Sequence, residues 1–446
     1  MLRRASKFKD KRSRPRKPAR DRTPIPLLEE LKSTADPAAA LRRLQDADPD
    51  HLSYPVCSSL LYRLAKARLL PELNSLLALL RAHRVPCKEA AFNSLIRRFG
   101  RAGLPDRALA LFLDLPSFDC PSAPSLQSLN SALAALVDNR RVDQARALLG
   151  RCTDFGIRPN AVSYNILLHG CCENEGSGSA RLLFDEMLAR RVRPTVVSYN
   201  VLIGYSCRNG DSVTGMRLKE EMVKKGIQPN AITYALLMEG LCSEGKYDAA
   251  RKLMFDMEYQ GCKTTLVNYG VLMSDRGRRG DFDRMRELLA EMNRRKLKPD
   301  VVIYGILINY LCVAGRTGEA YKVLVEMQIK GCKPNAATYR MMVDGFCRAG
   351  EFEKAAGVLN AMLASKHSPR AESFRCLILG LCERGKLEEA CFVLEEMIKR
   401  KMGLDVEGWK ALAEATMGGN CVIEDQLLRQ LIFPMFDEGS CKLERI

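Results

Sequence analysis

The chain has 446 residues, with 70 Lys and Arg against 53 Asp and Glu, which gives a formal net charge of +17. A hydrophobic fraction of 47% is ordinary for a folded protein and excludes intrinsic disorder over most of the chain. No apolar run reaches the roughly 18 residues that a membrane-spanning helix needs.

The N-terminal segment, residues 1–25, is strongly basic. Residues 1–22 contain eleven Lys and Arg and two Asp, which amounts to +9 of the net charge. An Arg-rich, acid-poor segment is typical of organellar targeting, and the alternative is a basic arm that helps to bind a polyanion. We therefore expect a mitochondrial protein, with the chloroplast as the alternative location. Residues 26–53 are expected to form an N-terminal linker or cap.

From residue 159 to residue 409, the sequence repeats itself every 35 residues. Met occupies one slot without a gap from Met187 to Met397, and an aromatic residue occupies another from Tyr164 to Trp409. A further slot holds Cys172, Cys207, Cys242, Cys312, Cys347 and Cys382, with Gly277 at the one interruption. No two of the 17 Cys are spaced C-x-x-C, so we predict packing roles for this series and no metal site.

Each 35-residue unit has the pattern of two helices. In residues 196–230, Tyr199, Ile203 and Cys207 share one face of a first helix, and a second helix ends before Pro229. Such a pair cannot bury both of its faces alone, so it must stack on neighbouring pairs. The sequence thus predicts an all-α superhelical solenoid of about ten helix-turn-helix hairpins.

We expect this solenoid to span residues 54–405. Its predicted units are 54–88, 89–125, 126–160, 161–195, 196–230, 231–265, 266–300, 301–335, 336–370 and 371–405. Residues 406–446 begin another unit and then lose the pattern, as expected for a degenerate repeat and a C-terminal cap.

Unit 196–230 carries the shared residues Val197, Tyr199, Asn200, Leu202, Ile203, Cys207, Gly210, Met222, Gly226, Pro229 and Asn230. A 35-residue hairpin with these residues resembles the pentatricopeptide repeat (PPR), in the subclass that has only standard repeats. The resemblance implies a right-handed solenoid that binds single-stranded RNA in plant organelles. It implies a role in intron splicing, transcript stabilisation or processing, with no catalysis, cofactor, small-molecule substrate or membrane. Other splicing or processing factors are further candidate partners.

The resemblance also implies which residues read RNA, because the family uses the residue after the aromatic and the last residue of the unit. In the first half these pairs are Ser58 with Lys88, Asn93 with Ser125, Asn130 with Asn160, Asn165 with Thr195, and Asn200 with Asn230. In the second half they are Ala235 with Thr265, Gly270 with Asp300, Gly305 with Asn335, Arg340 with Arg370, and Arg375 with Asp405. The units that begin at residues 89, 126, 161 and 196 should then prefer pyrimidines, and those with Gly270 and Gly305 should lean weakly to G and then A.

The chemistry of these residues fits that role in part. An Asn amide offers two donors and one acceptor, so it can bond to a base edge, and helix capping or simple solvation are the alternatives. The three Arg could stack on bases or hold phosphates, or they are plain surface charge. The apolar second residues of the units could wedge between bases or pack in the core, and they are Val162, Val197, Ile232, Val267 and Val302.

No catalytic motif is complete. Residues 240–247 and 380–387 nearly match a phosphate-binding loop but lack the Ser or Thr that binds magnesium. None of the four His begins the H-x-E of a zinc deaminase. We therefore expect a protein that is not an enzyme. The competing function is a helical-repeat scaffold that binds protein partners.

Overall fold

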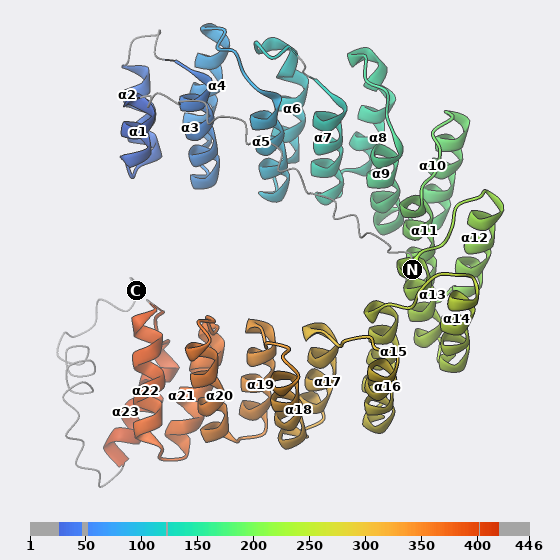
Figure 1. Ribbon diagram of the computed structural model, residues 1–446. Coiled ribbons are helices and arrows are strands. Elements are labelled where there is room, and N and C mark those ends of the chain that lie inside the picture. The colour runs from blue at the N-terminus through green and yellow to red at the C-terminus, as the bar shows by residue number, and fades with distance from the viewer. Residues whose placement is uncertain (1–25, 47–51, 122–123, 401, 419–446) are drawn as a thin grey trace, which may run out of the picture. The chain divides into compact units, whose positions relative to one another are not determined.

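The computed structural model describes residues 26–46, 52–121, 124–400 and 402–418, and every regular element in these ranges is helical (Figure 1). The expected all-α fold of stacked helical hairpins is therefore confirmed. The basic segment 1–25 and residues 419–446 of the expected C-terminal cap lie outside the described residues.

The helices fall into two bodies, divided between Arg193 and Pro194. The first body contains α1 (Pro26–Ser33), α2 (Pro37–Gln45), α3 (Tyr54–Ala67), α4 (Leu70–Ala82), α5 (Glu89–Arg101), α6 (Pro105–Asp114), η2 (Leu115–Ser117), α7 (Leu126–Asp138), α8 (Val142–Gly150), η3 (Cys152–Phe155), α9 (Ala161–Asn174) and α10 (Ser177–Ala189). The second contains α11 (Val196–Arg208), α12 (Ser212–Lys224), α13 (Ala231–Ser243), α14 (Tyr247–Tyr259), α15 (Leu266–Arg278), α16 (Phe282–Arg294), α17 (Val301–Val313), α18 (Thr317–Ile329), α19 (Ala336–Arg348), α20 (Phe352–Ala364), α21 (Ala371–Glu383), α22 (Leu387–Lys399) and α23 (Val406–Gly418).

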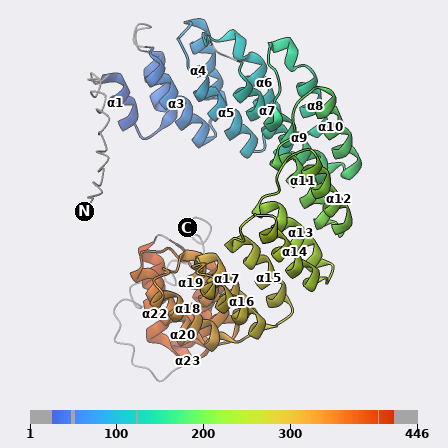
Figure 2. The same ribbon diagram turned by 45° about the vertical axis from the view of Figure 1, so that its right-hand side comes forward.

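Within each body, successive hairpins stack mainly through their first helices. In the first body, α7 packs against α5 on one side and α9 on the other. In the second body, α13 packs in the same way between α11 and α15, and α17 packs between α15 and α19. Figure 2 shows the hairpins side by side along each body. The first helices therefore form a layer of their own in each body, and the same residue position recurs along that layer.

Polar residues begin many of the first helices. The Oδ1 atom of Asn230 accepts the N–H groups of the second and third residues of α13, at 3.1 and 3.0 Å. Asp300 caps α17 in the same way, at 3.1 and 3.0 Å. Such caps typically contribute about 1 kcal/mol. Between α11 and α12, Gly210 has a φ of +75°, a left-handed conformation that glycine adopts without strain.

The aromatic series forms the centre of each hairpin. Tyr164, Tyr199, Tyr234, Tyr269 and Tyr304 are all buried. The Tyr269 hydroxyl donates to Oε1 of Glu291 on α16 at 3.0 Å, which ties the two helices of one unit together. Burial raises the pKa of Tyr269, and the hydrogen bond to the Glu291 carboxylate raises it further.

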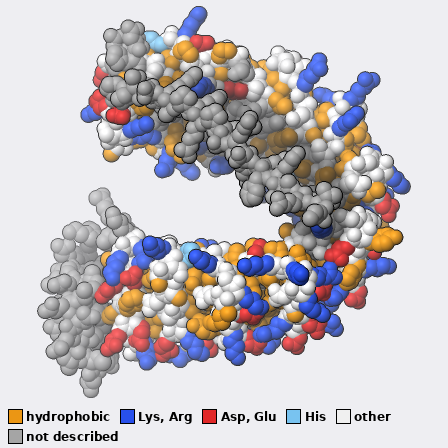
Figure 3. Space-filling view, viewed as in Figure 1, with side chains coloured by type: hydrophobic (Ala, Val, Ile, Leu, Met, Phe, Trp, Pro, Cys, Tyr) orange, Lys and Arg blue, Asp and Glu red, His pale blue; other side chains and the backbone are white. Residues whose placement is uncertain are grey.

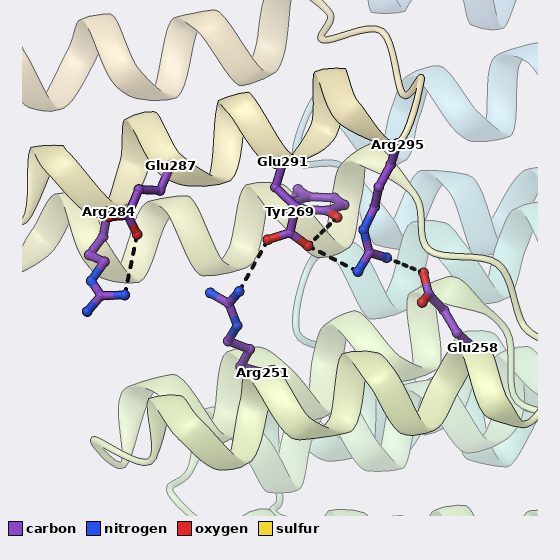
Figure 4. A network of polar contacts seen from close by, with 7 residues as sticks. All are labelled: Arg251, Glu258, Tyr269, Arg284, Glu287, Glu291 and Arg295. Carbon is purple, nitrogen blue, oxygen red and sulfur yellow. Dashed lines mark hydrogen bonds and ion pairs between the residues drawn. The ribbon is translucent and has the colours of Figure 1, made fainter.

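The Glu291 carboxylate also joins two neighbouring units (Figure 4). Arg251 of α14 lies 3.2 Å from Glu291 Oε2, and Arg295 lies 3.1 Å from Oε1. Arg295 in turn reaches Glu258 of α14 at 2.7 Å. This cluster therefore connects the second helices of adjacent units through charge-assisted hydrogen bonds. Glu291 is largely buried, so water screens these contacts little.

Two residues of the Cys series lie where neighbouring first helices approach each other closely. Cys207 on α11 faces Gly240 on α13, and a Cβ added at Gly240 would lie 2.6 Å from the Cys207 Cβ. Cys312 and Gly345 repeat this arrangement, with an added Cβ 2.6 Å from Cys312 Sγ. The predicted packing role of these Cys is confirmed.

The one interruption of that series is compensated across the interface. A Cβ at Gly277 would lie 2.2 Å from Cδ2 of Tyr310, because the Tyr310 ring occupies the space that a Cys side chain fills elsewhere. At this interface the glycine therefore lies on the earlier helix and the large residue on the later helix, which is the reverse of Cys207 and Gly240.

Candidate nucleic-acid interface

The Asn residues that follow the aromatic do not all lie alike. Asn130, Asn165 and Asn200 are partly exposed on their first helices. Asn93 is only 1% exposed, and neither its amide oxygen nor its amide nitrogen has a partner among the described residues. Three of the four successive Asn thus reach the surface, and Asn93 does not offer its amide there.

The last residues of the units serve mainly as helix caps. Asn160 and Asn335 accept backbone N–H groups of α9 and α19, as Asn230 and Asp300 do for α13 and α17. Ser125, Thr195 and Thr265 stand at the same position before α7, α11 and α15, each within a capping box. Helix capping was an alternative for the Asn after the aromatic, and the structure assigns it instead to the last residue.

A hydroxyl from the following unit joins the two predicted base-reading residues in two places. Ser163 Oγ donates to Asn130 Oδ1 at 2.6 Å and accepts the N–H of Asn160 at 3.3 Å. Thr233 Oγ1 donates to Asn200 Oδ1 at 2.7 Å and accepts the N–H of Asn230 at 3.2 Å. These hydroxyl residues are not among the predicted RNA-binding residues. The available signal is a Ser or Thr at the third place of most units, namely Ser128, Ser163, Ser198, Thr233, Thr338 and Ser373. In all of these except Ser128, the next residue is the aromatic.

The apolar second residues lie at the surface. Val162 in the first body is 52% exposed, and in the second body the exposed fractions are 55% for Val197, 54% for Ile232, 55% for Val267 and 60% for Val302. The alternative that these side chains pack in the core is therefore wrong. Since they precede the Asn position by three residues, they share its helix face.

Two hollows lie over these positions, one in each body. The first has a volume of about 560 Å³ and is lined by Ser125, Gln127 and Asn130 of the predicted face, with Arg97 beside them. The second, of about 490 Å³, brings together the pair Gly270 and Asp300 with both neighbouring Val residues, Val267 and Val302, and with Tyr310. The second hollow therefore brings together Gly270 and Asp300, the predicted pair of one unit, although they are far apart in the sequence. The first hollow joins Asn130 to Ser125, the last residue of the preceding unit.

The second half of the predicted pairs offers less side-chain chemistry. Ala235 is 5% exposed, and Gly270 and Gly305 are buried, so these positions contribute backbone and space. Arg340 is half-buried and its Nε donates to the Ala336 carbonyl at 3.0 Å. Arg370 is exposed at the start of α21, and its side chain makes no cap hydrogen bond.

The last pair forms an ion pair. Arg375 lies 3.0 Å from Oδ2 of Asp405 and also contacts Glu407. Figure 3 shows Lys and Arg side chains interspersed with Asp and Glu over the second body, rather than gathered in one patch. Arg375 is therefore already neutralised by two carboxylates, and a phosphate would have to compete with them.

Other kinds of site find no support in the described ranges. No group of three or more His, Cys, Asp or Glu there is placed to hold a metal ion. No helix in the same ranges is long and apolar enough to cross a membrane.

Comparison with known proteins places the chain among helical repeats. The PPR repeat family matches residues 124–173, 159–204, 194–243 and 299–348, and the PPR repeat matches residues 90–120, 232–262, 337–367 and 372–402. Similar Arabidopsis thaliana proteins include the mitochondrial pentatricopeptide repeat-containing protein At1g07740, 48% identical over 31% of this chain and 30% of its own length. Another is the mitochondrial protein At5g16420, 35% identical over 24% of this chain and 20% of its own length. The chain therefore spans under a third of the length of these relatives.

Solved structures with similar folds include PPR10 in complex with an 18-nt psaJ RNA element. It is 21% identical, with a TM-score of 0.48, over 87% of this chain and 65% of that one. The PPR domain of Arabidopsis thaliana protein-only RNase P 1, in complex with tRNA, is 18% identical with a TM-score of 0.33, over 41% of this chain and 96% of that one. From the matched repeats and the hairpins that they form, the chain belongs to the pentatricopeptide repeat family.

Proposed function

We propose that this protein binds single-stranded RNA in a sequence-selective way and acts on organellar transcripts without catalysing a reaction. The observation that carries the proposal is the repeated surface of the first helices. There, exposed aliphatic second residues recur every 35 residues from Val162 to Val302, and Asn occupies the fifth place at Asn130, Asn165 and Asn200. Second, fifth and last residues line the two hollows. Repeats of this kind read about one base each through two or three side chains.

The chemistry of that surface suits unstacked bases. An aliphatic side chain such as Val197 can lie against a base face, and the amide of Asn200 can bond to the base edge. The net charge of +17 favours a polyanionic partner. A double helix would hide these edges, so single-stranded RNA is the form that fits.

The competing scaffold function explains less. A peptide-binding groove has no need for a partly exposed amide at the fifth place of three successive units, nor for a hollow that joins Gly270 to Asp300. A scaffold would also show a weak dependence on salt, whereas phosphate contacts give a steep one.

The cellular role rests on the relatives and on the basic segment. Two similar proteins carry mitochondrial names, and residues 1–25 have the composition of a targeting sequence. We therefore propose mitochondrial transcripts as the substrate, with the chloroplast as the alternative. Splicing, stabilisation and processing all follow from occupying a stretch of RNA.

The proposal is tested by selecting tight-binding sequences from a random single-stranded RNA pool with the purified full-length protein. We expect an enriched sequence with pyrimidines opposite the units that begin at residues 126, 161 and 196. Its affinity should fall steeply as salt is raised, and a duplex of the same sequence should bind weakly. Recovery of unselected RNA together with a salt-independent affinity would refute the proposal and favour the scaffold.

A further inference from the structure

Ser163 and Thr233 stand at the third place of their units. This place is neither one of the two predicted base-reading positions nor the position of the exposed aliphatic residues. Each hydroxyl lies on the third residue of a first helix and contacts the Asn of the preceding unit, 33 residues earlier. Both are fully buried. They therefore do not touch a ligand themselves, but they contact a residue that is placed to do so.

The direction of these hydrogen bonds follows from counting donors and acceptors. Asn230 Oδ1 already accepts two backbone N–H groups, from Ile232 and Thr233, which uses both of its lone pairs. The Thr233 oxygen accepts the Asn230 N–H, so its proton is left to be donated. The hydroxyl lies 3.1 Å from Asn230 Oδ1, which is already saturated, and 2.7 Å from Asn200 Oδ1, which has a free lone pair and therefore takes the proton.

The same count holds in the first body. Asn160 Oδ1 accepts N–H groups at 3.0 and 3.2 Å, and Ser163 Oγ then donates to Asn130 Oδ1 at 2.6 Å. If the Asn130 amide were rotated by 180°, its NH₂ group would face the Ser163 hydroxyl. The hydroxyl proton would then have to be donated to Asn160 Oδ1, which already accepts two N–H groups. The hydroxyl thus selects one of two amide orientations.

We propose that Ser163 and Thr233 are positioning residues for sequence selectivity. Each holds the carbonyl of the preceding unit's Asn inward, so that the NH₂ group is presented to the RNA. Among the described residues, no protein group bonds to the amide nitrogen of Asn130 or Asn200, so both donors stay available. The amide then acts only as a donor and favours a base with an acceptor at that edge, such as uracil O4 or cytosine N3. This inference rests on the proposed function.

The chain offers a matched control in Thr338. Its hydroxyl also contacts the capping residue of its own helix, Asn335, at 3.1 Å. The preceding unit, however, has Gly305 in place of Asn, so there is no amide to orient. Thr338→Val therefore removes a hydroxyl contact with the capping Oδ1, as Thr233→Val does at Asn230, without affecting an Asn at the fifth place of the preceding unit.

The test measures dissociation constants for four RNAs that differ only at the nucleotide facing unit 196–230. That nucleotide is the one whose identity matters to the wild-type protein but not to Asn200→Ala. We expect the wild type to discriminate by about tenfold between the best and the worst base, and Thr233→Val to discriminate by less than about threefold. Thr233→Ser should restore the preference, and Thr338→Val should leave it unchanged at this nucleotide.

The outcomes separate the two levels of the proposal. Full discrimination by Thr233→Val, or an equal loss in Thr338→Val, would overturn the positioning role while RNA binding stands. A wild-type protein that shows no preference at any nucleotide would overturn the proposed function and this inference together. Thermal unfolding of the two Val variants shows whether both have lost a similar amount of stability.

Discussion

Replacing Gly240 by Ala tests whether the contact between first helices sets the spacing of the repeats. The added Cβ would lie 2.6 Å from the Cys207 Cβ and 3.1 Å from its Cα, so α11 and α13 must move apart. Overpacking of this kind typically lowers the free energy of unfolding by about 1–3 kcal/mol. Ala stabilises a helix by about 1 kcal/mol relative to Gly, which offsets part of the loss. We expect a net decrease of up to about 2 kcal/mol in the free energy of unfolding, measured by chemical denaturation.

Gly357→Ala is the matched control. Gly357 lies inside α20, and an added Cβ there meets nothing within 4 Å. Since only the helix preference changes, this variant should become more stable by up to about 1 kcal/mol. The two Gly→Ala changes should therefore have opposite signs.

A double variant locates the clash. Cys207→Gly combined with Gly240→Ala removes the nearest atoms and exchanges the small and the larger residue, as Gly277 and Tyr310 do two interfaces further along. The double variant should be more stable than the sum of the two single changes by about 0.5–2 kcal/mol, which is the range of coupling for residues in contact. If Gly240→Ala is as stable as Gly357→Ala, or if the two changes add without coupling, the packing argument is refuted.

Three further predictions concern the interface and the core. Replacing Asn165 and Asn200 by Ala should weaken binding of the preferred RNA by roughly 1–3 kcal/mol per lost contact and leave binding of random RNA nearly unchanged; equal weakening of both RNAs would mean that these Asn do not specify sequence. Val197→Ala should lower affinity for every RNA sequence but change the free energy of unfolding by less than about 0.5 kcal/mol, because the side chain is 55% exposed; a large loss of stability would contradict the surface position. Because the pKa of Tyr269 is raised above its ordinary value of 10.0, its contribution to stability is present below pH 10 and is lost as the pH rises beyond that. Between about pH 9 and pH 12, the free energy of unfolding should therefore fall less in Tyr269→Phe than in the wild type. An equal fall in both proteins would contradict this prediction.

The sequence predicts the hairpins well because the Tyr, Cys and Met series each face the core, and burial fixes one residue type at one position. The start of each first helix follows from the same period, although the residue that caps it was not identified as a cap. Asn230 was selected as a base reader, yet its side-chain oxygen is bound to the backbone of α13. A period shows that a position matters but not which contact makes it matter.

The remaining differences depend on neighbours in space. Asn93 has the same place in its unit as Asn130, but its side chain is buried, and its place in the unit does not indicate this burial. Gly277 interrupts the Cys series because the ring of Tyr310, 33 residues later, occupies the space that a side chain at residue 277 would need. The orientation of the Asn200 amide is set by Thr233, also 33 residues later. Each of these features is decided across an interface between units, where a single unit carries no information.

The position of Thr233 has a practical consequence for engineered arrays. A block excised at the sequence period, from residue 196 to residue 230, keeps Asn200 and Asn230 but leaves behind the hydroxyl that joins them and the helix that Asn230 caps. If this block is joined to a foreign block whose third residue is Ile, as Ile303 is in unit 301–335, Asn200 and Asn230 lose the hydroxyl that both contact. The transferable module is therefore longer than the period: it should carry residues 231–233 with it, and the junction with the next block should fall before Tyr234.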